Sequence, residues 1–157
     1  MNGRKRTFLD GGVLITAYKG SPAIEQPATL ILDDPGRVLL TSPFVRHEVS
    51  PKALFNKQIL EYRFYQRYFR RALFCDDLNA ILNCARKESA RSGIGPMDSL
   101  HIAAAHLLDA DEFITTESQA SPSTGGRSSR SFICSVRPRT WHLSALSAPA
   151  SRSKLVP

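Results

Sequence analysis

The chain of 157 residues is 42% hydrophobic, which favours a single domain built around one core. Its net charge of +7 is unevenly spread: residues 1–117 hold all 14 acidic and 15 of the 21 basic residues, so bulk charge does not mark that segment as a nucleic-acid binder. The three cysteines form no CxxC pair, which argues against a disulfide framework. No apolar run approaches the roughly 20 residues that a membrane span needs. Together these features favour a cytoplasmic protein.

Apolar runs and turn residues predict strands that alternate with helices. Strands are expected at residues 6–9, 37–41 and 112–116. Helices are expected at residues 13–18, 22–33, 52–73, 76–91 and 97–108, with a short additional helix that opens at Pro43 and carries Glu48. Strands separated by helices require crossover connections on both faces of a parallel sheet. The sequence therefore predicts a three-layer α/β/α domain with a central parallel sheet.

The composition changes after residue 117. Residues 118–157 contain 11 serines and six basic residues but no acidic residue, and they show little periodicity. Such a segment cannot bury enough apolar surface to fold alone, so an irregular or disordered basic tail is expected. Residues 131–136 resemble a strand and are expected to add at most one edge strand. The predicted division is a domain at residues 1–117 and a Ser/Arg-rich tail at residues 118–157.

Four carboxylates stand beside the predicted strands and helix starts. Asp10 ends the first strand, Glu117 follows the third, Glu48 follows the second, and Asp98 opens the helix at residues 97–108. Because ligands bind beyond the carboxyl ends of parallel strands, we expect these acids to gather at one edge. Their mutual repulsion calls for a cation, and oxygen donors without a Cys or His cluster favour Mg²⁺ or Mn²⁺. Such a site suits hydrolysis of a phosphodiester.

Each acid also has an ordinary structural explanation. Asp10 can cap a turn, Glu48 can be a solvated surface residue, and Asp98 is favoured by the helix dipole by roughly 0.3–1 kcal/mol. His101 lies one helical turn after Asp98 and is expected to be a satisfied, partly buried histidine. Thr115 and Thr116 can orient an acid or a phosphate, although strand propensity explains them equally well. The metal hypothesis therefore depends on the set of acids and not on any one of them.

Residues 55–74 combine aromatic and basic side chains. They hold seven of the 13 aromatic residues, which are expected to pack inward or at a dimer contact. Four arginines follow the same segment: Arg63, Arg67, Arg70 and Arg71. They are candidates for phosphate contacts to RNA, and a simply solvated helix face is the alternative.

Three segments together resemble the PIN-domain family. They are residues 7–15 (TFLDGGVLI), residues 47–49 (HEV) and residues 97–105 (MDSLHIAAA), the last followed by ADEFITT at residues 110–116. The resemblance implies a PIN-like α/β/α ribonuclease that uses Mg²⁺ or Mn²⁺, and many small members are VapC-like toxins of toxin–antitoxin pairs. It implies that Asp10, Glu48 and Asp98 are catalytic, metal-binding acids. Glu117 stands where the family usually has an aspartate.

Three hypotheses follow. The first is an endoribonuclease toxin with RNA as substrate, an antitoxin as partner and a homodimer as assembly. The second is a catalytically impaired PIN-like module that binds RNA or a partner, because the tail does not match the family's last helix and strand. The third is a receiver-like or phosphatase-like domain with Asp10 as nucleophile. Gly12 counts against one version of it, because a haloacid-dehalogenase-type site needs a second aspartate there.

Overall fold

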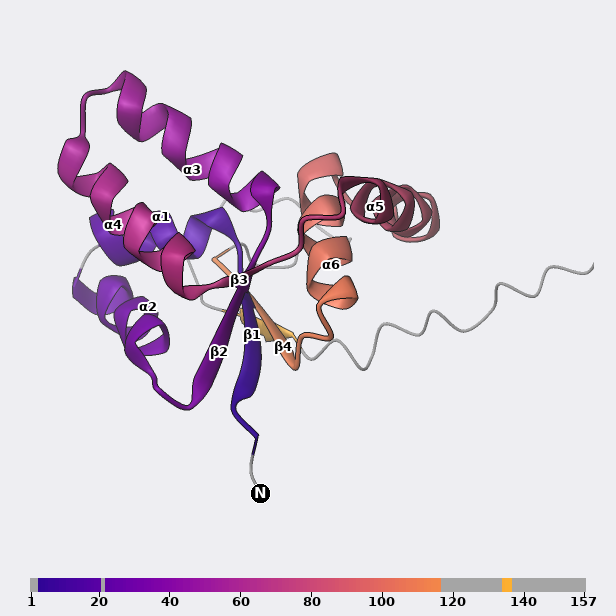
Figure 1. The fold of residues 1–157 in the computed structure, drawn as a ribbon, viewed down its shortest axis with the longest axis horizontal. Helices are drawn as coiled ribbons and strands as arrows, with labels where there is room; N and C mark the ends of the chain where they lie inside the picture. Colours follow the sequence, from indigo (N-terminus) through magenta and orange to yellow (C-terminus); the bar gives the residue numbers. More distant parts are fainter. Residues whose placement is uncertain (1–2, 21, 117–133, 137–157) are drawn as a thin grey trace, which may run out of the picture.

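A single sheet organises the chain. The computed structural model describes residues 3–20, 22–116 and 134–136 (Figure 1). Within them five strands lie in the order β3-β2-β1-β4-β5. The strands are β1 (Lys5–Leu9), β2 (Arg37–Thr41), β3 (Leu73–Phe74), β4 (Glu112–Thr115) and β5 (Cys134–Val136). The first four are parallel, and β5 pairs antiparallel with β4.

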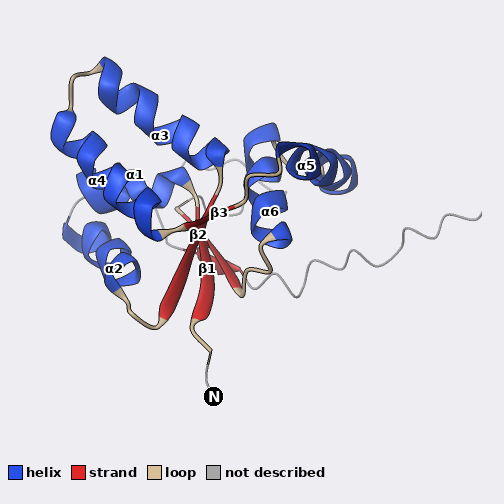
Figure 2. Cartoon of the chain, viewed as in Figure 1, coloured by secondary structure: helices blue, strands red, loops and turns tan. Residues whose placement is uncertain are grey.

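Helices connect the parallel strands and cover the sheet on two sides. They are α1 (Gly11–Lys19), α2 (Pro22–Asp33), α3 (Pro43–Phe55), α4 (Ile59–Arg71), α5 (Leu78–Ser92) and α6 (Pro96–Leu107). Figure 2 shows α1, α2 and α4 on one side of the sheet and α5 and α6 on the other. The predicted three-layer architecture with a central parallel sheet is confirmed. No helix in the described ranges has the length and apolar character needed to span a membrane.

One helix prediction was wrong. The sequence pattern favoured a continuous helix over residues 52–73, but α3 runs on through Pro51 and ends at Phe55. Lys57 has a left-handed φ of 56°, which a helix does not allow, and α4 begins only at Ile59. The backbone N–H groups of Lys57 and Gln58 still bond to carbonyls of α3, which closes the helix end. The two-residue strand β3 was not predicted, because two residues carry no periodicity.

The core lies between the sheet and its helices. Phe8 of β1 is fully buried and stacks on Phe113 of β4, with ring centroids 5.6 Å apart. Leu9 and Leu40 are fully buried as well. A fully buried side chain of this size contributes about 1.5–3 kcal/mol to folding. The carboxyl end of β1 is therefore held rigidly, and the next residue is Asp10.

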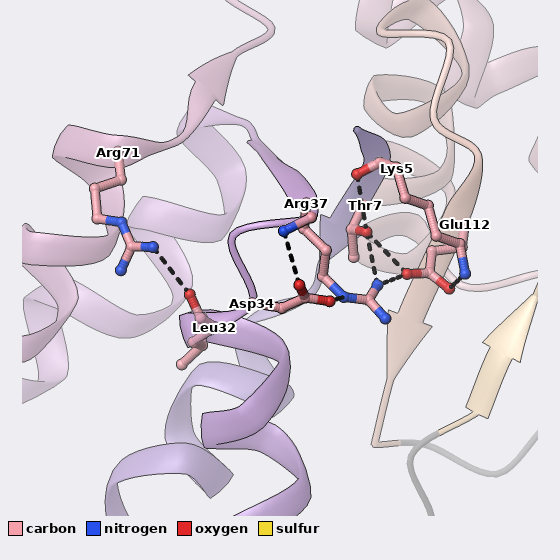
Figure 3. Close-up of polar contacts among 8 residues, drawn as sticks. Lys5, Thr7, Leu32, Asp34, Arg37, Arg71 and Glu112 are labelled. Carbon is pink, nitrogen blue, oxygen red and sulfur yellow. Dashed lines mark hydrogen bonds and ion pairs between the residues drawn. The ribbon is translucent and has the colours of Figure 1, made fainter. Parts of the chain in front are cut away.

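A polar network fastens the opposite, amino-terminal edge of the sheet (Figure 3). Glu112 of β4 is only 2% exposed, and its carboxylate accepts hydrogen bonds from Lys5 Nζ at 2.5 Å and from Thr7 Oγ1 at 2.8 Å. Arg37 of β2 pairs with the same carboxylate and donates to Thr7 Oγ1 at 2.9 Å. Its Nε also donates to Asp34 Oδ2 at 2.9 Å. These contacts tie three neighbouring strands together far from the acids at the carboxyl edge.

The aromatic residues of α4 largely pack inward, as expected. Tyr65, Tyr68 and Phe69 are buried, whereas Phe55 at the end of α3 is 86% exposed. Buried Glu61 accepts a hydrogen bond from Tyr65 at 2.6 Å and pairs with Lys19 Nζ at 2.8 Å. This ion pair fixes α4 against the end of α1.

Some predictions fall on residues that the structure does not describe. Glu117 and most of the predicted tail lie outside the described residues, as do positions 131–133 of the expected edge strand. The backbone of β5, at Cys134–Val136, is described at the sheet edge. The division into residues 1–117 and 118–157 stays a prediction.

Candidate functional site

Asp10 is placed by the junction between β1 and α1. Its backbone N–H donates to Ile114 O of β4 at 3.2 Å, and its Oδ1 accepts a hydrogen bond from Val13 N at 2.9 Å. The carboxylate therefore caps the N-terminus of α1, which is the position that helices favour for Asp. The residue is only 9% exposed. Capping explains the local geometry, yet it leaves a buried charge at the carboxyl edge of the sheet.

The surroundings of Asp10 oppose its ionisation. Burial is the main cause that raises the pKa of Asp10 above its ordinary value of 3.8, and the nearby charge of Glu48 raises it further. Hydrogen bonds from Thr115 and Val13 and the neighbouring His101 lower it, but less than burial raises it. The hydrogen bond from Thr115 to Asp10 agrees with the expectation that this threonine orients an acid. The site thus holds a carboxylate whose charge is only partly balanced.

Glu48 reaches the same place from α3. Ser42 Oγ accepts from Val45 N at 3.5 Å to cap α3, and Pro43 opens the helix as predicted. The Glu48 carboxylate lies directly over Gly11, because a methyl group built at Gly11 would come within 2.2 Å of Glu48 Oε2. Only glycine leaves room for this approach. Glu48 is thus a neighbour of Asp10 and not an isolated surface charge.

Gly11→Ala is expected to displace the Glu48 carboxylate while the fold survives. The new methyl group would collide with the end of a side chain and not with backbone, so Glu48 can move away. We expect thermal stability to change little but the binding of Mn²⁺ to weaken. Calorimetric titration with Mn²⁺ measures this, and Gly3→Ala is the control, because nothing lies within 4 Å of a methyl group at Gly3. Equal Mn²⁺ affinities of the Gly11 and Gly3 variants would contradict the placement of Glu48.

His101 joins the two acids from α6. Its ring is 3% exposed, and its Nε2 lies 3.1 Å from Glu48 Oε2. Phe8 packs beside the imidazole, with ring centroids 6.4 Å apart. The expectation of a partly buried, satisfied histidine missed this partner. One signal for it existed, since a residue one turn after Asp98 shares its helix face, but the sequence did not indicate which acid the ring would meet.

Asp98 is placed less closely. It lies exposed in the first turn of α6, and its Oδ2 is 3.4 Å from where a methyl group at Gly95 would sit. Within residues 3–20, 22–116 and 134–136, no three Asp, Glu, His or Cys side chains gather in a geometry ready to hold a metal ion. Asp10 and Glu48 are thus brought together, whereas a preassembled three-acid cluster with Asp98 is not found among these residues. Glu117 lies outside them.

The donor atoms at this edge suit a hard divalent cation. Two carboxylates are near one another, and a cation between them would offset the repulsion that raises the pKa of Asp10. Mg²⁺ is typically held by one or two carboxylates, with water and phosphate oxygens completing its coordination. Asp10 and Glu48 supply that number, and α6 carries a further acid, Asp98. Two carboxylates can therefore suit Mg²⁺, because water and phosphate oxygens can supply the remaining ligands.

The arginines of α4 form a separate feature. Arg67, Arg70 and Arg71 are exposed and line a cavity of about 440 Å³ together with Leu32, Asp33, Leu39, Phe64 and Tyr68. Arg71 is partly engaged, since its Nη2 donates to Leu32 O at 3.2 Å. Arg63 is exposed and does not line the cavity. Tyr68 connects this cavity to the sheet, because its hydroxyl donates to Leu40 O at 2.9 Å.

Comparison with known proteins identifies the fold. No family model matches the chain, and no curated protein matches its sequence. The structure is similar to VapBC2 from Rickettsia felis bound to a DNA fragment from its promoter, with a TM-score of 0.53, 16% identity, and coverage of 71% of this chain and 87% of the other. It is also similar to a toxin–antitoxin complex from Klebsiella pneumoniae, with a TM-score of 0.56, 18% identity, and coverage of 72% and 88%. At these identities the likeness shows a PIN-like fold.

Proposed function

We propose that this protein is a divalent-metal-dependent endoribonuclease and the toxin of a toxin–antitoxin pair. The observation that carries the proposal is the meeting of Asp10 and Glu48 at the carboxyl edge of the sheet, over Gly11. This is the edge at which parallel sheets bind their ligands. The PIN-like fold supports the same function, since the similar structures include a toxin–antitoxin complex.

The roles of the residues follow from their placement. Asp10 and Glu48 hold the cation, with Asp98 as a further oxygen donor and Glu117 as a candidate beyond the described residues. When bound, Mg²⁺ or Mn²⁺ supplies Lewis-acid activation of water and of the scissile phosphate. Thr115 orients Asp10 by its hydrogen bond. Burial of Asp10 limits access of bulk water, which strengthens electrostatic interactions at the site.

The partners follow from the same proposal. RNA is the substrate, and Arg67, Arg70 and Arg71, with Arg63 nearby, supply guanidinium groups that contact phosphates outside the cleavage site. An antitoxin protein is the regulatory partner, and a homodimer is the expected assembly. We expect the protein, its RNA substrate and its antitoxin to meet in the cytoplasm.

The test is cleavage of RNA by the purified chain with and without divalent cations. Wild-type protein is expected to cut RNA with Mn²⁺ or Mg²⁺ and to stop when EDTA is added. Asp98→Asn is expected to slow cleavage at least about tenfold, because a lost ligand removes more than 1.4 kcal/mol of transition-state stabilisation. A purely structural role for Asp98 would instead change stability by about 0.3–1 kcal/mol through the helix dipole and leave cleavage intact.

A second candidate is a PIN-like module that binds RNA or a partner without turnover. It is favoured by one observation, the lack of a ready three-residue metal cage among the described residues. Wild-type chain that binds RNA with a steep salt dependence, yet cuts none with any divalent cation, would select this alternative.

A further inference from the structure

We propose that His101 is a positioning residue that holds the Glu48 carboxylate beside Asp10 through a hydrogen bond from its Nε2–H. This inference deepens the proposed function, since it assigns a residue outside the acidic set to the same site. His101 does not contact the substrate or the cation in this arrangement. It acts through Glu48.

Two contacts confine the Glu48 carboxylate. Oε2 lies 3.1 Å from His101 Nε2 on one side. On the other side it rests on Gly11, where an added methyl group would lie only 2.2 Å from Glu48 Oε2. The Glu48 side chain as a whole emerges from α3 and is 37% exposed, so solvent alone would leave it several rotamers. The histidine therefore selects the one orientation that faces the buried acid.

The imidazole is built for this role by its burial. The ring is 3% exposed and packs beside Phe8, which is itself fully buried. Its Nδ1 is buried and has no hydrogen-bond partner among the described residues. A proton on Nδ1 would be buried without a hydrogen-bond acceptor, and this costs more free energy than burying an Nδ1 that carries no proton. The geometry thus favours a proton on Nε2, pointed at Glu48.

A simple core histidine would not have this arrangement. A histidine kept only for packing would satisfy its polar atoms with the backbone around it. Here the one contacted nitrogen meets a functional carboxylate from another helix, 53 residues earlier in the chain. Hydrogen-bond partners of ligating carboxylates of this kind typically affect metal affinity about 10-fold to 100-fold.

Two substitutions separate positioning from packing. His101→Gln keeps an N–H near the place of Nε2, whereas the shorter His101→Asn reaches only as far as Nδ1. We expect Asn to weaken the binding of Mn²⁺ about 10-fold to 100-fold, and Gln to keep most of the affinity. Titration calorimetry with Mn²⁺ alone measures this without RNA. His106→Asn, on the exposed face of the same helix, is the control and should bind Mn²⁺ as wild type does.

A second measurement does not depend on metal or on a His101 variant. In wild-type protein labelled with ¹⁵N-histidine, the His101 ring should show a slowly exchanging proton on Nε2. Glu48→Ala should speed that exchange. A proton found on Nδ1, or a signal that ignores the Glu48 change, would overturn the proposal. So would equal Mn²⁺ affinity of wild type and a folded His101→Asn protein, or equal losses in the Gln and Asn variants.

The outcomes separate this inference from the proposed function. Wild type that binds Mn²⁺ with a His101-dependent affinity but cuts no RNA would remove the nuclease and keep the positioning role. If wild type cuts RNA while both His101 variants bind Mn²⁺ normally, the nuclease proposal stands and the positioning role of His101 is removed. If wild type binds no Mn²⁺, the nuclease proposal falls, and the ¹⁵N spectrum alone decides the role of His101.

Discussion

Asp10→Asn should abolish RNA cleavage while leaving the protein at least as stable as wild type. Asn can still accept the hydrogen bond from Val13 N, since Asn and Asp cap helices about equally well. It cannot bind a cation through a negative charge. Losing the several kcal/mol that a Lewis acid contributes lowers the rate by at least about 100-fold. The measurement is initial-rate cleavage of RNA with Mn²⁺, beside a urea denaturation of each protein.

The difference in stability between the Asp10→Asn variant and wild type should depend on pH in a definite direction. Burial raises the pKa of Asp10 in the folded state above its ordinary 3.8. Any stabilisation linked to that shift is therefore present below the unfolded pKa and lost as pH rises through the folded pKa. At neutral pH without divalent cations the ionised Asp10 destabilises the fold, and the Asn variant escapes this. Its stability advantage over wild type should grow from below pH 3.8 toward neutrality.

A matched control exists on another helix. Asp77 caps α5 through the equivalent hydrogen bond, accepting from Ala80 N at 2.9 Å, but it lies on the exposed surface. Asp77→Asn should leave cleavage unchanged. If Asp10→Asn cut RNA as well as Asp77→Asn, the assignment of Asp10 to the site would be wrong.

Arg37→Ala should be the most destabilising change at the amino-terminal edge of the sheet. It removes the guanidinium that pairs with buried Glu112 and with Asp34 (Figure 3). Removing one partner of a buried ion pair leaves an uncompensated charge and typically costs about 3–5 kcal/mol. We expect about 3 kcal/mol here, since Lys5 and Thr7 still contact Glu112.

The control for Arg37 is a surface ion pair between Arg71 and Asp33. The two side chains lie 3.7 Å apart, and both are more than half exposed. Arg71→Ala should therefore change the free energy of unfolding by no more than about 1 kcal/mol. Chemical denaturation of both variants compares them. Equal losses of stability would show that the Glu112 network does not hold the strands together as described.

Much of the fold was predictable because the relevant signals are local. Residues 37–41 form a strand with the predicted bounds, since a continuous apolar run suits a strand buried on both faces. Gly93 ends α5 with a left-handed φ of 72°, as a glycine after a helix often does. The break at Lys57 was missed, because lysine gives no warning of a positive φ. Packing imposes that conformation from outside the segment.

The site was predictable in part. Asp10 and Glu48 were predicted to lie at one edge, because the carboxyl ends of parallel strands meet at the same edge of a sheet. The contact of His101 with Glu48 could not be predicted, since it depends on how α6 rotates against α3. The close approach of Glu48 to Gly11 could not be predicted either, because it also depends on how the helices pack. Sequence patterns locate acids along the chain, whereas the details of packing decide which of them touch.

The central claim is that Asp10 and Glu48 share a divalent cation. Anomalous diffraction from crystals grown with Mn²⁺ tests it most directly, because it locates the ion without reference to activity. We expect one strong peak within bonding distance of both carboxylates. A site occupied elsewhere, with these two side chains left uncoordinated, would contradict it.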